Sequence, residues 1–170
     1  SLYARKMVRR LWGEEIHDAI AISSNNLPTY KLNTYGTIQY AMQFPEPLAL
    51  PDGASGKVTG FLDSFLRGNR DDQPRSGEGS ILQALGLMNN TFVMTRTSPT
   101  SPASGLLATS LKLPNTELVN TLFLAVLSRY PTQQELNEAL ANLANTSTRN
   151  NEAQDLLWSL YNKVDFIFNY

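Results

Sequence analysis

Apolar residues recur at three- and four-residue spacing along most of this chain, which is the pattern of amphipathic helices. The first such pattern covers residues 2–22. Similar patterns follow at residues 58–66, 81–96, 102–111, 116–129, 133–145 and 151–168. Two of these segments begin with the spacing of a capping box, Ser80 with Gln83 and Thr132 with Glu135. The chain is therefore predicted to be mainly helical.

A long polar stretch at residues 25–56 interrupts the helical pattern. It contains Phe-Pro-Glu-Pro at 44–47 and Pro-Asp-Gly at 51–53, which are turn signals. A short strand or helix could occupy residues 37–44. The last four predicted helices have short connections, which favour antiparallel neighbours. The expected fold is all-α: one domain over residues 1–170, an irregular bundle of about six or seven helices with a long loop region at 25–56.

Composition excludes several classes of function. The chain has 170 residues and a net charge of −1, so no strong overall field favours nucleic acid or an anionic membrane. It contains no cysteine, which excludes disulfides, iron–sulfur clusters and thiolate zinc sites from this sequence. No apolar run approaches the roughly 18 residues that a membrane span needs. The sequence starts within a helical pattern and without Met, so we expect a fragment from the C-terminal end of a longer protein.

Four segments carry a resemblance to a known family. Residues 9–19 contain two arginines, acidic residues and then Asp-Ala. Residues 68–76 and 83–89 read Gly-Asn-Arg-Asp-Asp-Gln-Pro-Arg-Ser and Gln-Ala-Leu-Gly-Leu-Met-Asn. Residues 122–135 contain Arg-x-Pro-Thr-x-x-Glu, and residues 155–169 contain Asp-Leu-Leu-Trp-Ser-Leu-Tyr-Asn and Asp-Phe-Ile-Phe-Asn. In this order they resemble the domain-of-unknown-function 1553 family, also called the planctomycete cytochrome-associated PSD-one domain.

The resemblance implies a context but no reaction. Members of this family are usually large exported bacterial proteins, often with a cytochrome-like or sugar-binding-like module upstream. The chain is then expected to be extracytoplasmic and to dock on upstream domains or on another protein. Haem would belong only to upstream modules, and no cofactor is expected in this domain. His17 stands where the family more often has Arg.

Two carboxylates of the first helix fall inside its apolar arc by helical phase, Glu15 and Asp18. A buried carboxylate must find a partner or become protonated. Arg129 is the first candidate partner, because it also falls in an apolar arc. Arg70, Arg75 and Arg96 are alternatives. The arrangement predicts either a structural ion-pair cluster or a cleft with a shifted pKa.

The chain lacks the standard catalytic signatures, so no catalytic residue and no metal site are assigned. His17 is the only histidine, and helical phase places it on the polar surface of its helix. Asn89 falls in an apolar face and is expected to be a buried amide that bonds a backbone group. The charged loop with Arg70, Asp71, Asp72 and Arg75 is the best surface candidate for recognition, or else satisfies its own charges in ion pairs.

Three functions follow from these observations. The leading one is a non-catalytic interaction or accessory domain of an exported multidomain protein. The second is an enzyme, or part of one, with Glu15 and Asp18 facing a cleft beside Arg70 or Arg75. The third is a carbohydrate-binding helical module. Its stacking faces would come from Trp12, Tyr30, Tyr35 and Tyr40. The basic cluster at residues 5–10 has no interleaved aromatics, so nucleic acid is not an expected partner, and neither is membrane insertion.

Overall fold

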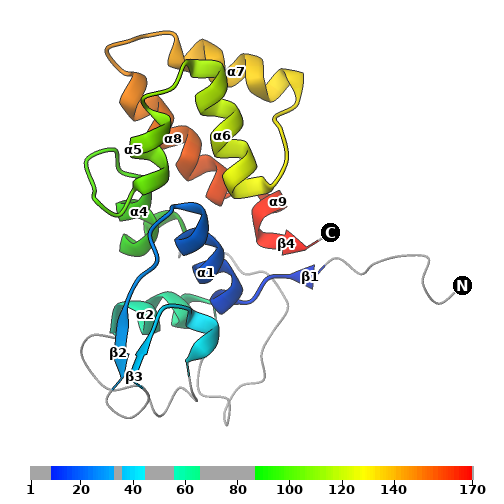
Figure 1. The fold of residues 1–170 in the computed structure, drawn as a ribbon. Helices are drawn as coiled ribbons and strands as arrows, with labels where there is room; N and C mark the ends of the chain where they lie inside the picture. Colours follow the sequence, from blue (N-terminus) through cyan, green and yellow to red (C-terminus); the bar gives the residue numbers. More distant parts are fainter. Residues whose placement is uncertain (1–8, 33–35, 45–55, 66–86, 170) are drawn as a thin grey trace, which may run out of the picture.

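The structure, a computed structural model, describes residues 9–32, 36–44, 56–65 and 87–169, and it is mostly helical (Figure 1). The helices are α1 (Gly13–Ser23), α2 (Gly56–Ser64), α4 (Thr91–Thr97), α5 (Gly105–Ser110), α6 (Asn115–Leu127), α7 (Gln133–Leu143), α8 (Arg149–Tyr161) and α9 (Val164–Ile167), with a 3-10 turn, η1 (Ala41–Gln43). The strands are β1 (Arg9–Arg10), β2 (Tyr30–Leu32), β3 (Gly36–Ile38) and β4 (Phe168–Asn169).

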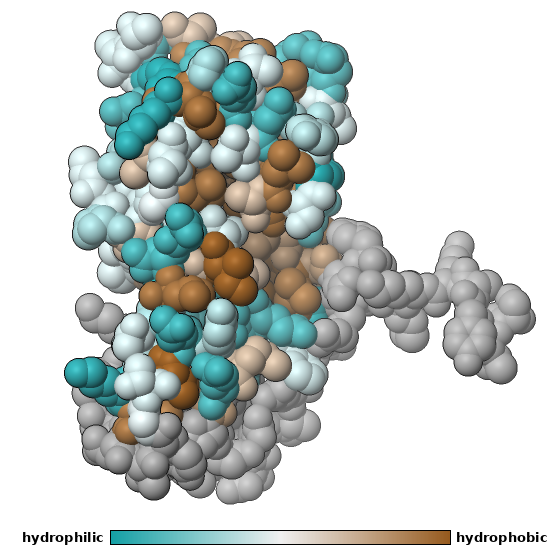
Figure 2. Space-filling model, in the orientation of Figure 1, coloured by the Kyte–Doolittle hydropathy of each residue, from teal (hydrophilic) through white to brown (hydrophobic). Residues whose placement is uncertain are grey.

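Helix α1 connects the two ends of the molecule. In Figure 1, α5 to α8 gather at one end, and α2 lies with the β2–β3 hairpin at the other. Helix α1 contacts α2 and η1 on one side and α6 on the other. Its residues Ile16 and Ile20 are fully buried in a core shared by all these helices. Figure 2 shows that some apolar surface remains exposed in the middle of this face, at the height of α1.

The helical hairpin of α6 and α7 confirms the corresponding prediction to within two residues. The predicted capping box is present, because Thr132 N–H donates to Glu135 Oε2 at 2.8 Å and Glu135 N–H donates to Thr132 Oγ1. Helix α6 ends at Ser128, which has a φ of 55° and so adopts the left-handed conformation that stops helices. Local signals therefore determined these two helices.

Within the expected loop region at 25–56, the short strand or helix allowed at residues 37–44 is present as β3 and η1, whereas strand β2 was not expected. Strands β2 and β3 form an antiparallel hairpin in which Tyr30 faces Ile38 and Leu32 faces Gly36, and η1 follows it. Tyr30 and Leu32 are buried while Lys31 between them is exposed, so the strand has the period-two alternation of a half-buried sheet. Strand β2 has only three residues, so its alternation does not stand out among the surrounding turn residues in the sequence. Residues 33–35 and 45–55 lie outside the described part.

The predicted first and last helices are both shorter than expected. Helix α1 starts at Gly13 because Arg9–Arg10 instead pairs with Phe168–Asn169 as strands β1 and β4. The predicted helix at 151–168 is divided into α8 and α9, with Lys163 at the break. Helical periodicity could not reveal this pairing, because it joins the two ends of the described chain.

Two further helix starts differ from the sequence prediction. The predicted helix at 81–96 is interrupted at Asn90, whose side chain accepts a hydrogen bond from Phe92 N–H and caps α4. Residues 81–86 lie outside the described part. Helix α5 begins at Gly105 and not at Pro102, because Ser104, the residue before it, turns inward and donates its hydroxyl to Arg96 O. A local side-chain cap therefore sets the start of α4, whereas the start of α5 follows a contact with a residue eight positions earlier.

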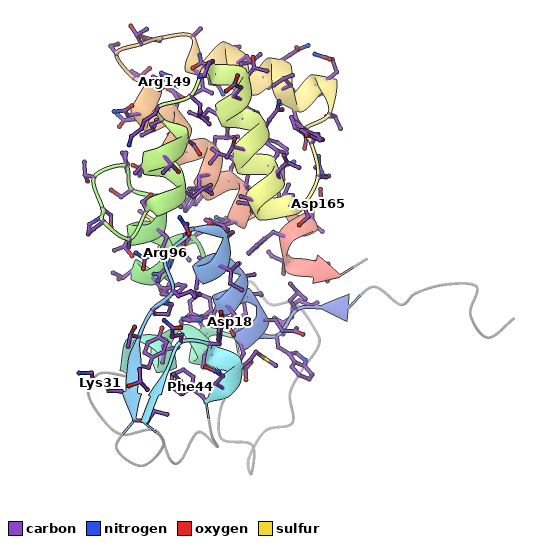
Figure 3. The ribbon with its side chains drawn as sticks, viewed as in Figure 1. Asp18, Lys31, Phe44, Arg96, Arg149 and Asp165 are labelled. Carbon is purple, nitrogen blue, oxygen red and sulfur yellow. The ribbon has the colours of Figure 1, made fainter. Side chains whose placement is uncertain are left out.

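Arg149 joins the start of α8 to the end of α5. Arg149, at the start of α8, donates to the carbonyls of Leu111 and Leu113 after α5 and to the amide oxygen of Asn115 (Figure 3). All three distances lie between 2.7 and 2.8 Å. Carbonyls at a helix end have no partner inside the helix, so this guanidinium satisfies them and holds α8 against α5.

An ion-pair network joins the α6–α7 junction to α9. Arg129 forms a two-bonded pair with Glu135, at 2.8 and 2.9 Å, and also bonds Asp165 at 2.8 Å. Lys163 bonds the same Glu135 carboxylate at 2.8 Å. The Arg129 guanidinium, followed by Lys163, holds the pKa of Glu135 well below its usual range. The network therefore positions the break between α8 and α9.

We expect Glu135→Gln to lower the free energy of unfolding by about 1–3 kcal/mol at pH 7, because it removes charge-assisted hydrogen bonds to Arg129 and Lys163. The Glu135 pKa is lower in the folded chain, so its contribution is present above about pH 4.5 and is lost as the pH falls below that value. Urea unfolding from pH 7 to pH 3 measures this. Glu138→Gln, on the same helix, is the control and should change little.

Candidate functional site

His17 and Asp18 of α1 form a buried polar cluster with Tyr30 of β2. Asp18 Oδ1 accepts from Ala41 N–H at 2.6 Å, and its Oδ2 accepts from Met42 N–H at 3.1 Å (Figure 3). Oδ1 also lies 2.9 Å from His17 Nδ1, and His17 Nε2 lies 2.9 Å from the Tyr30 hydroxyl. Because the Asp18 oxygens accept from backbone N–H groups, His17 Nδ1 is a donor and Nε2 accepts from Tyr30.

Aromatic rings enclose the imidazole of His17, which is fully buried. The ring of Phe92 stacks on it with centroids 4.2 Å apart, and Phe61 meets it edge-on at 5.5 Å. The Arg96 guanidinium lies over the Phe92 ring, 3.6 Å from its centroid. Burial lowers the pKa of His17, although the bond to Asp18 opposes this effect, and Arg96 lowers it further. Burial also raises the pKa of Tyr30 to about 12.

This environment corrects the prediction that His17 is a surface histidine. Helical phase gave α1 one apolar and one polar side, but α1 has neighbours on both sides. The supposed polar side faces Tyr30 of β2 and Phe92 of α4. The imidazole of His17 is fully buried, and both of its nitrogens are hydrogen-bonded within the protein.

The structure does not bring Glu15, Asp18 and Arg129 together. Asp18 is buried as predicted, but its partners are backbone amides and His17. Glu15 is half-buried and accepts from Trp12 N–H at 2.7 Å at the start of α1. Arg129 belongs instead to the network with Glu135 and Asp165. The predicted cluster with Arg129 is therefore wrong, since backbone groups of η1 satisfy the Asp18 carboxylate.

The other candidates differ in their outcome. Asn89 is exposed, which corrects the expected buried amide, because the break at Asn90 changes the helical phase on which that prediction depended. The proposed recognition loop with Arg70, Asp71, Asp72 and Arg75 lies outside the described residues. Of the candidate stacking aromatics, Tyr30 is buried, Tyr40 is half-buried, Trp12 is 38% exposed and Tyr35 lies outside the described part.

A groove of about 300 Å³ lies over α7 and α8, and we name it the α7–α8 groove. Its apolar lining comes from three helices: Phe123, Ala139, Leu143, Leu156 and Leu160. Its polar lining is Glu135, Glu138, Asn142, Glu152, Asp155, Ser159 and Lys163. Sequence reasoning missed this site. The available signal was a pair of carboxylates three residues apart on each of two helices expected to be antiparallel neighbours.

Two further features bear on the site. Within residues 9–32, 36–44, 56–65 and 87–169, no group of three or more histidines or acidic residues is placed to hold a metal ion. None of the helices in the described ranges is both long and apolar enough to cross a membrane.

No protein-family model, no curated protein and no solved structure matches this chain. The membership in the 1553 family remains a prediction from its four sequence segments.

We expect the free energy of unfolding to fall as the pH is lowered below about 6.5. The pKa of His17 is lower in the folded chain than in the unfolded chain, so unfolding takes up a proton in this range. The slope should reach at most about 1.4 kcal/mol per pH unit. His17 is the only histidine. In urea unfolding, the free energy of unfolding of His17→Gln should therefore show no such dependence on pH. An unchanged slope in this variant would contradict the assignment.

Proposed function

We propose that this chain is a non-catalytic interaction domain, an irregular single-domain helical bundle that serves an exported multidomain bacterial protein as an accessory module. The observation that carries the proposal is the α7–α8 groove, where an apolar floor lies between carboxylate walls on two neighbouring helices. Such a combination of apolar contact and charge is typical of surfaces that bind proteins. The exported, extracytoplasmic and multidomain context has its support in the resemblance to the 1553 family.

The buried polar cluster supports a non-catalytic role over the enzymatic alternative. That alternative needs Asp18 in an open cleft, whereas Asp18 is buried and both of its carboxylate oxygens accept backbone hydrogen bonds. The side chains of His17 and Tyr30 are likewise engaged within the protein, because His17 Nε2 and the Tyr30 hydroxyl are hydrogen-bonded to each other. A general acid or base must come within hydrogen-bond reach of its substrate, and the buried His17 imidazole has both nitrogens bonded within the protein.

We expect zero-length carbodiimide cross-linking of the full-length parent protein to join groove carboxylates to lysines of its other modules. Cross-links should contain Glu152 or Asp155, because these side chains form the open wall on α8, and Glu152→Gln with Asp155→Asn should remove them. Glu117, an exposed carboxylate at the start of α6, is the matched control. Mass spectrometry identifies the linked peptides. Cross-links at Glu117 as frequent as those in the groove would contradict a specific interface.

A second candidate function, carbohydrate binding, has one observation in its favour. A hollow of about 460 Å³ after α1 is lined by Ile22, Asn25, Asn26, Leu27 and Tyr40. Amide side chains can donate and accept hydrogen bonds with hydroxyl groups, and a half-buried aromatic ring offers an apolar face. The burial of Tyr30 opposes the larger aromatic platform that the sequence suggested.

If this hollow binds sugar, Tyr40→Ala should weaken oligosaccharide affinity by about tenfold, equivalent to about 1.4 kcal/mol. Isothermal titration calorimetry with soluble cello-, xylo- and chito-oligosaccharides measures the change. Tyr130→Ala is the control, because Tyr130 is 65% exposed and does not line the hollow. If wild-type protein releases no heat with any of the three sugars at millimolar concentration, the candidate is rejected.

A further inference from the structure

The α7–α8 groove concentrates negative charge on an apolar floor. Four carboxylates and one ammonium line it, so its local formal charge is −3, while the whole chain has a net charge of −1. Glu135 is compensated by Arg129 and Lys163. In the described part of the chain, Glu138, Glu152 and Asp155 form no ion pair. These three side chains give the groove its uncompensated charge.

The neighbouring carboxylates repel one another, so a cation brought between them gains favourable electrostatic energy. Glu152 and Asp155 are three residues apart on α8 and lie on the same side of that helix. Glu138 is on the neighbouring helix α7. A ligand with cationic groups on two of its sides can therefore contact carboxylates of both α7 and α8.

The apolar floor selects among cationic ligands. Phe123, Leu143 and Leu160, from α6, α7 and α8, line the bottom and are at most 2% exposed, and Leu156 beside them is partly exposed. A small inorganic cation gains nothing from this surface, whereas aliphatic side chains are stabilised by contact with it. The volume of about 300 Å³ is at the lower limit for a drug-sized ligand and suits a few side chains of a helix.

We propose that the α7–α8 groove docks a basic amphipathic helix of a partner protein, with its aliphatic face on the floor and its lysines or arginines against Glu138, Glu152 and Asp155. This partner chemistry rests on the proposed interaction function and specifies it. Charge complementarity and the apolar floor together favour this occupant, because recognition of a helix in a groove uses both features. Asn142 and Ser159 provide hydrogen-bonding groups at the rim.

A synthetic helical peptide tests the proposal. The probe is a fluorescent peptide of about 18 residues, with leucines on one face and lysines on the other, which is long enough for several turns. Fluorescence anisotropy measures its affinity for the purified chain. The control peptide has the same composition in a scrambled order, so that it has the same charge but no apolar face.

We expect the amphipathic peptide to bind at least about tenfold more tightly than the scrambled peptide. Glu152→Gln with Asp155→Asn should reduce its affinity by about tenfold, while Glu117→Gln should leave it unchanged. Affinity should also fall between about 50 and about 300 mM salt, because screening weakens exposed charge pairs. Circular dichroism and thermal unfolding of each variant show whether the chain remains folded.

Any one of the following results would overturn the proposal. Equal binding of the scrambled peptide would indicate attraction by charge alone, and unchanged affinity of the groove variant would place binding elsewhere. A dimer in sedimentation velocity that dissociates in Asp155→Lys would assign the groove to a second copy of the chain. If peptide binding fails but groove cross-links persist in the parent protein, the interaction function stands and only the partner chemistry is wrong. If both fail, both are rejected.

Discussion

The carboxylate of Asp18 holds the first helix against the turn that follows the hairpin, and much of the molecule depends on this contact. Its two oxygens accept from the backbone of Ala41 and Met42 while the same carboxylate bonds His17. His17 in turn bonds Tyr30, so helix, hairpin and 3-10 turn meet at one buried point. A buried carboxylate without hydrogen-bond partners would destabilise the fold. These bonds explain why the chain tolerates Asp18 in this buried position.

Charges in the two halves of the molecule serve different purposes. Around α1 every polar atom of Asp18 and both nitrogens of His17 have partners inside the protein. Around α7 and α8, Glu135 is bonded to Arg129 and Lys163, whereas Glu138, Glu152 and Asp155 face a groove. Satisfied buried groups stabilise the fold, and the groove charges remain available to a partner. This contrast is the physical basis for the proposed interaction function.

The arginine contacts explain how the groove keeps its shape. Arg149 fixes the start of α8 on the end of α5, and Arg129 with Glu135 fixes the region where α8 gives way to α9. Both ends of α8 are thereby held while its acidic side remains free to contact a ligand. A preorganised surface loses less entropy on binding than one that must first order itself.

The sequence by itself determined the elements whose signals are local. Thr132 and Glu135 start α7 through a capping box, and helical phase placed Asp18 in a buried arc. Only the tertiary structure decided the environment of His17, the pairing of β1 with β4 and the acidic groove. The physical reason is range: caps and helical periodicity depend on residues three or four apart, whereas these features join segments distant in the chain. The resulting contacts depend on which faces meet, and no local pattern contains that information.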